Sequence, residues 1–149
     1  MDFSRAGIDA LAERFAAAAI SATEWTHQTH LVMGAWHVAR FGPEAALARL
    51  RAGIRALNAA HGTVDSDSRG YHDTITCAYV RLLAAFAASR PAGEAIDATV
   101  AALLASPLAA REVLTRHYSR ERLFSVAARR GWVEPDLAPL PGEERSDDD

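Results

Sequence analysis

The chain has 149 residues, a formal net charge of −3 and a single cysteine, and half of its residues are hydrophobic. This length suits one domain with one core, and the charge lacks the strong basic excess of nucleic-acid-binding proteins. A lone cysteine excludes an internal disulfide. No secretory signal opens the chain, and no apolar run reaches the ~18 residues of a membrane span. We therefore expect a cytoplasmic protein with neither a nucleic-acid nor a membrane partner.

Alanine, leucine and arginine dominate the sequence, and this composition favours helix over strand. Apolar residues recur at helical spacing in seven segments, which predict helices over residues 5–20, 23–41, 44–60, 71–89, 94–105, 108–116 and 119–130. The second of these helices should begin after a Thr23 cap and end at Gly42 and Pro43. The expected fold is an all-α, single-domain antiparallel helical bundle, with four to five main helices and short C-terminal ones.

The sequence predicts that the C-terminal segment after Gly131 is a tail with two parts. Residues 132–141 should run extended along the bundle and complete a domain that spans residues 1–141. Acidic residues predominate in 142–149, and this part is expected to be disordered. The apolar anchors of the extended part would be Trp132, Val133, Leu137 and Leu140.

Two histidine-containing segments stand out. His27 and His30 lie three residues apart near the start of the second helix, and His72 lies near the start of the fourth. Short loops make consecutive helices antiparallel, so both helix starts should meet at one end of the bundle. Gly34, one turn after His30, leaves room there for a neighbouring helix or for a ligand.

Neutral imidazoles suit Zn, Fe, Ni or Cu, and three histidines with an open position form a common catalytic metal site. We therefore predict that His27, His30 and His72 bind a divalent transition metal. Asp73 would be a fourth ligand or would orient an imidazole. A metal-bound water would then act on a small-molecule substrate. The residues expected to position that substrate are Tyr71, Thr76 and Asn58.

The same residues allow two other interpretations, and whether the chain is an enzyme stays open. The polar end of the bundle could instead form a non-catalytic pocket for a small organic ligand or a partner protein. It could also be a purely structural polar cluster. Trp25 and Trp36 are expected to lie away from the histidines and to pack against other helices or form a homodimer contact. Cys77 is expected to be a buried structural thiol.

Six parts of the chain carry a recognisable set of motifs: 25–31 (WTHQTHL), Asn58, 70–76 (GYHDTIT), 118–125 (YSRERLFS), 134–137 and 139–141. These motifs resemble those of a family of small bacterial proteins without an established activity. In that family a glutamate follows the Tyr-His pair, whereas this chain has the shorter Asp73, which reaches less far toward a metal. The helical bundle is also loosely similar to the DinB-like bundles with three-histidine sites, although here the paired histidines are three residues apart.

Overall fold

Helix α1 (Arg5–Ala16) begins at Ser4, whose hydroxyl accepts a hydrogen bond from the N–H of Gly7 at 3.1 Å. One face of the helix carries Ile8, Leu11 and Phe15, which are buried in the main core.

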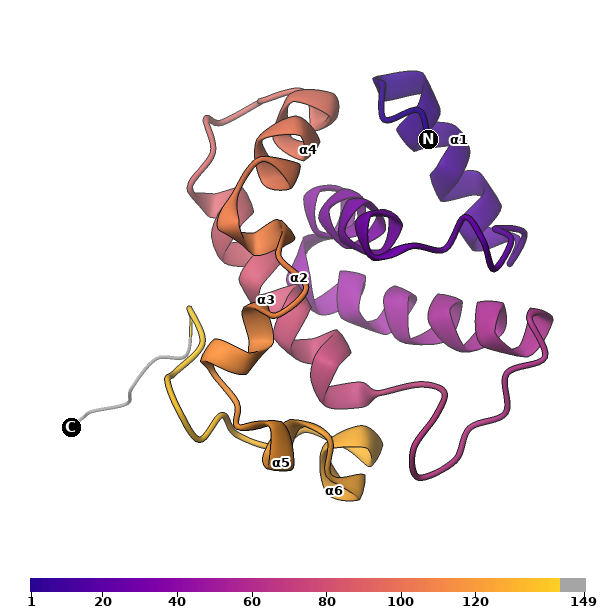
Figure 1. Cartoon of the computed structure of the whole chain (residues 1–149). Helices are drawn as coiled ribbons and strands as arrows, with labels where there is room; N and C mark the ends of the chain where they lie inside the picture. Colours follow the sequence, from indigo (N-terminus) through magenta and orange to yellow (C-terminus); the bar gives the residue numbers. More distant parts are fainter. Residues whose placement is uncertain (143–149) are drawn as a thin grey trace.

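The computed structural model describes residues 1–142. The regular elements of this part of the chain are all α-helices and 3-10 helices, joined by turns and irregular segments, without a strand (Figure 1). The predicted all-α fold is confirmed.

Helix α2 (His27–Ala60) consists of two helical segments that meet at Gly42. Gly42 has φ 81° and ψ 163°, a conformation that glycine adopts without strain. Pro43 then opens the second segment, where its missing N–H costs nothing. Figure 1 shows the two segments running in clearly different directions. The predicted break at Gly42 and Pro43 is therefore confirmed.

The first segment of α2 starts later than predicted. Thr26 is its cap, because the Thr26 hydroxyl accepts a hydrogen bond from the N–H of Thr29 at 3.3 Å. The preceding residues form a turn in which Glu24 makes an ion pair with Arg14 of α1. That tertiary contact overrides local helix propensity, so the predicted cap at Thr23 is wrong.

Helix α3 (Asp73–Ala88) packs closely against α2. At Gly34 of α2, an added Cβ atom would lie 2.4 Å from the Cδ1 atom of Leu83, so only glycine admits this approach without movement of the leucine. Helix α4 (Ile96–Leu104) adds Val100 and Leu103 to the same core. The glycine thus brings α2 and α3 together, which was one of its two expected roles.

The C-terminal third contains shorter elements than predicted. Ser125 interrupts the expected helix over 119–130, because its hydroxyl accepts a hydrogen bond from the N–H of Ala128 at 3.1 Å and so caps a new helix. The expected helix over 108–116 is replaced by two 3-10 turns. The elements of this region are η1 (Pro107–Ala109), η2 (Val113–Arg116), α5 (Arg120–Leu123) and α6 (Val126–Arg130).

The tail packs against a second, smaller core built around Tyr118. The Tyr118 hydroxyl donates a hydrogen bond to the carbonyl of Val133 at 2.8 Å, and Leu140 is buried. Leu137, in contrast, is 59 % exposed, so its predicted role as an anchor is wrong. Most of the predicted acidic tail, residues 143–149, lies outside the described residues. No helix within residues 1–142 is long and apolar enough to cross a membrane.

Candidate functional site

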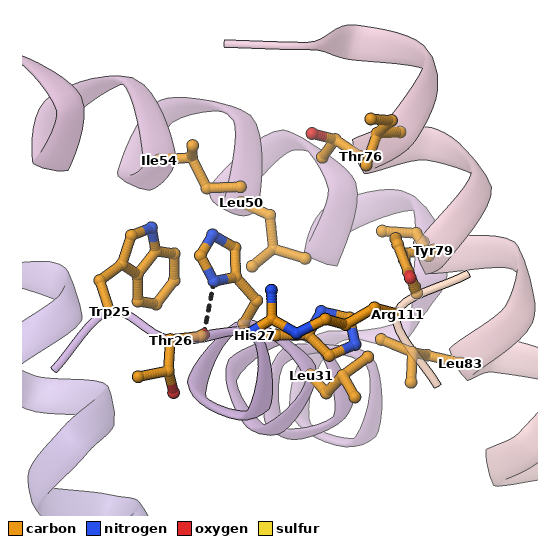
Figure 2. A pocket seen from close by; sticks show the side chains of 14 residues that line it. Trp25, Thr26, His27, Leu31, Leu50, Ile54, Thr76, Tyr79, Leu83 and Arg111 are labelled. Atoms are coloured by element: carbon orange, nitrogen blue, oxygen red, sulfur yellow. Dashed lines mark hydrogen bonds between the residues drawn. The ribbon is translucent and has the colours of Figure 1, made fainter. Parts of the chain in front are cut away.

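A hollow of about 440 Å³ lies between the two segments of α2 and helix α3 (Figure 2). Its walls are mostly apolar, and its polar side chains come from the start of α2, from Thr76 and Tyr79 of α3, and from Arg111. Gly34 is among the lining residues, but the Leu83 side chain occupies the space that a Cβ atom of Gly34 would take, so room for a ligand beside this glycine stays a prediction. The lining residues are Trp25, Thr26, His27, His30, Leu31, Gly34, Leu50, Ile54, Ile75, Thr76, Tyr79, Val80, Leu83 and Arg111.

His27 is the first residue of α2, and its ring meets the Tyr79 ring edge-on with 6.1 Å between centroids. The Nε2 atom of His27 is covered by protein, yet it has no hydrogen-bond partner within residues 1–142. Buried polar atoms are rarely left unpaired. Burial, and then the positive charge of Arg111, lower the pKa of His27, so its imidazole is neutral at pH 7.

His30 lies at the edge of the hollow and is exposed on one side. Its Nδ1 atom is 2.7 Å from the carbonyl oxygen of Thr26, so Nδ1 carries the proton of the neutral ring (dashed line in Figure 2). The ring stacks on Trp25 with centroids 3.9 Å apart. The surrounding protein lowers the pKa of His30, and the Thr26 carbonyl offsets part of that effect.

Arg111 contributes the one Arg or Lys side chain among the described residues that line the hollow. Its side chain is exposed, and within residues 1–142 it makes neither a hydrogen bond nor an ion pair. Figure 2 shows the side chain extending past His27 at the edge of the hollow. An unpaired guanidinium beside an apolar hollow is suited to an anionic group.

His72 has a different role from the other two predicted ligands. Its Nδ1 atom accepts a hydrogen bond from the N–H of Ile75 at 3.2 Å, which caps α3. Its Nε2 atom lies 2.7 Å from the carbonyl oxygen of Leu123 in α5 and donates to it. Both ring nitrogens are therefore engaged, and His72 is not among the residues that line the hollow.

The donor atoms present do not fit the predicted three-histidine metal site. Within residues 1–142, no group of three or more His, Cys, Asp or Glu side chains is placed to hold a metal ion. His27 and His30 share the hollow, but His72 would have to give up both of its hydrogen bonds to join them. Metal binding by the chain stays a prediction.

Asp73 forms a bidentate ion pair with Arg51, with distances of 2.9 Å from Nε to Oδ1 and 3.0 Å from Nη2 to Oδ2. The Tyr71 hydroxyl donates to the same carboxylate at 2.7 Å. Burial by itself would raise the pKa of Asp73, but hydrogen bonds from Arg51 and Tyr71 hold that pKa below its usual range. Burial is also the main cause that raises the pKa of Tyr71 to about 12. The pair ties α2 to α3 outside the hollow.

Thr76 is the one residue of the predicted substrate-positioning set that lines the hollow, and its hydroxyl donates to the His72 carbonyl at 3.0 Å. Asn58 is half-buried near the end of α2 and is not among the lining residues.

Sequence reasoning missed Arg111, because its lack of a partner within residues 1–142 follows from tertiary packing. It also placed Trp25 on a helix, whereas this residue precedes α2 and borders the hollow.

The geometry of the hollow is the basis for assigning a function, and the resemblance to a family of small bacterial proteins stays a prediction. Comparison of the chain with protein-family models, with curated proteins and with solved structures finds no match.

Proposed function

We propose that this chain binds a small organic molecule with a largely apolar body in the hollow between α2 and α3. The observation that supports the proposal is the hollow itself, about 440 Å³ in volume and walled mostly by apolar side chains. Binding sites for small molecules typically have volumes of roughly 300–1,000 Å³, apolar walls and a few polar groups that orient the ligand.

The walls come from three rigid helical segments, so the site exists before a ligand arrives. Leu31 belongs to the first segment of α2, Ile54 to the second, and Leu83 to α3. A ligand that covers these side chains removes apolar surface from water, which contributes about 25 cal/mol per Å². The Nε2 atom of His27, which has no hydrogen-bond partner within residues 1–142, is the buried polar atom with which a polar group of the ligand would pair.

Calorimetric titration with octan-1-ol tests the proposal, because this probe is apolar, small and uncharged. We expect saturable binding with one site and a dissociation constant in the range of about 10 to 500 μM. Thr76→Trp fills the hollow and should abolish binding. Ala98→Trp adds the same side chain at an exposed position of α4 outside the hollow, and it should bind like the unmodified protein. The absence of saturable binding by the unmodified protein would overturn the proposal.

A metal centre is the second candidate, and one observation favours it. Within residues 1–142, the Nε2 atom of His27 has no hydrogen-bond partner, and the Nε2 lone pair of His30 is free because Nδ1 carries the proton. Two such nitrogens in one hollow could begin a metal site. Elemental analysis of the purified protein tests this candidate. Less than about 0.2 equivalents of any transition metal, together with no stabilisation when a transition metal is added, would contradict a metal centre.

A further inference from the structure

We infer that the ligand of the hollow is an organic monocarboxylate, with its apolar body between α2 and α3 and its carboxylate paired with Arg111. This inference rests on the proposed function and adds the chemical class of the ligand. It is carried by the position of the Arg111 side chain, by the lack of a hydrogen-bond or ion-pair partner for it within residues 1–142, and by the charges around it.

Arg111 stands on the wall between two hollows. A second hollow of about 390 Å³ adjoins the first and shares four lining residues with it. The shared residues are His27, Ile75, Tyr79 and Arg111. A guanidinium in this position can reach a carboxylate at the rim of the first hollow while the apolar body of the ligand lies inside. No hydrogen bond within residues 1–142 has to break for Arg111 to do so.

The charges around the second hollow favour a ligand with a single negative charge. Three charged side chains line it: Arg111, Arg120 and Glu112, which together carry one net positive charge. The guanidinium of Arg120 already lies over the Phe124 ring, 5.1 Å from its centroid. Glu112 would repel a second negative charge on the ligand. One carboxylate on the ligand would neutralise the net positive charge of these side chains. Its two oxygen atoms can accept two parallel N–H hydrogen bonds from a guanidinium group.

The apolar walls disfavour a free inorganic anion in the part of the hollow between Leu31, Ile54 and Leu83. Leu31, Ile54 and Leu83 offer no hydrogen-bond donor to a small anion, and a buried ion without donors loses its hydration without compensation. An amphipathic acid keeps its charge at the exposed rim, where Arg111 lies, and places only its apolar part between the helices.

Parallel calorimetric titrations with octanoate and octan-1-ol, at low salt and pH 7, test the inference. The two probes share one apolar body and differ in charge. We expect octanoate to bind the unmodified protein about three- to tenfold more tightly than octan-1-ol. Arg111→Gln should bring that ratio to about one and leave the affinity for octan-1-ol unchanged, which also shows that the variant is folded.

Arg116→Gln is the matched control, because it removes the same charge from an exposed residue that lines neither hollow, and it should keep the preference for octanoate. Equal affinities for the two probes in the unmodified protein, or a preference that survives in Arg111→Gln, would overturn the inference and leave the proposed function standing. Failure of both probes to bind would overturn both.

Discussion

The imidazole of His72 joins two helices that are far apart in the sequence. Its Nε2 atom donates to the carbonyl of Leu123 in α5 at 2.7 Å, while its Nδ1 atom accepts from the N–H of Ile75 in α3. The ring thus caps α3 and holds the C-terminal helices against its first turn. This arrangement requires a neutral imidazole with the proton on Nε2.

Replacing His72 should therefore affect stability first. His72→Ala removes the cap of α3 and leaves the Leu123 carbonyl without its donor, so we expect the free energy of unfolding to fall by about 1–3 kcal/mol. His72→Asn restores a capping side chain and should recover part of that loss. Urea unfolding followed by circular dichroism measures both variants. A change below about 0.5 kcal/mol for His72→Ala would contradict the structural role of the ring.

Acidification should destabilise the protein as the pH falls through 6.5. Burial is the main cause that lowers the pKa of four histidines from 6.5 in the folded chain, so the unfolded chain binds more protons below that pH. The stability they contribute is complete above pH 6.5 and is lost as the pH falls through their folded pKa values. These residues are His27, His30, His37 and His72.

Urea midpoints measured between about pH 7.5 and about pH 5.5 check this prediction, since carboxylates stay ionised over most of that window. His72→Asn removes one of the four groups, so its midpoint should fall less steeply with pH than that of the unmodified protein. A midpoint that is constant across this window, or one that rises on acidification, would show that the folded protein does not favour neutral histidines.

The ion pair between Arg51 and Asp73 should contribute to stability in a way that an exposed pair does not. The Asp73 side chain is 11 % exposed, and it also accepts a hydrogen bond from Tyr71. A double-mutant cycle with Arg51→Gln and Asp73→Asn should give a coupling energy of about 1 kcal/mol, because the 38 % exposure of Arg51 leaves part of the charge screened by solvent.

The pair between Arg130 and Asp67 provides the control for this cycle. Both side chains are mostly exposed, at 71 % and 63 %, so their coupling should not be measurable. Equal coupling energies for the two pairs would mean that the burial of Asp73 and its bond to Tyr71 add nothing to the interaction.

Gly34→Ala should weaken ligand binding while it leaves the free energy of unfolding nearly unchanged. The added Cβ atom would lie 2.4 Å from the tip of Leu83, which can turn into the hollow. The helix gains roughly 1 kcal/mol of propensity and loses a similar amount to repacking, so the free energy of unfolding should change little. The hollow becomes smaller, and the affinity for octan-1-ol should fall at least threefold. Unchanged affinity would place the ligand away from Gly34.

Much of the fold follows from the sequence because its signals are local. Helical spacing of apolar residues and the Gly42–Pro43 break fix α1, both segments of α2, α3 and α4 to within a few residues. The errors arose where a distant contact decides the local structure. The start of α2 depends on the pair between Glu24 and Arg14, which no local pattern reveals.

The site was harder to predict than the fold. Sequence spacing placed His27 and His30 together correctly at one end of α2, and it identified Gly34 as a point where a neighbouring helix approaches closely. It could not show that the nitrogens of His72 are committed to Ile75 and Leu123, because Leu123 is 51 residues away. The same limit applies to Arg111, whose lack of a partner within residues 1–142 depends on tertiary packing.

The measurement that tests the central claim most directly is NMR mapping of a bound probe on the ¹⁵N-labelled protein. On titration with octan-1-ol, the amide signals of Gly34, Thr76 and Leu83, which surround the hollow, should shift together and saturate with one dissociation constant. The amides of Gly93 and Ala95, which line a separate hollow, should not move. Saturating shifts centred on Gly93 and Ala95, or no saturating shifts at all, would contradict a ligand site between α2 and α3.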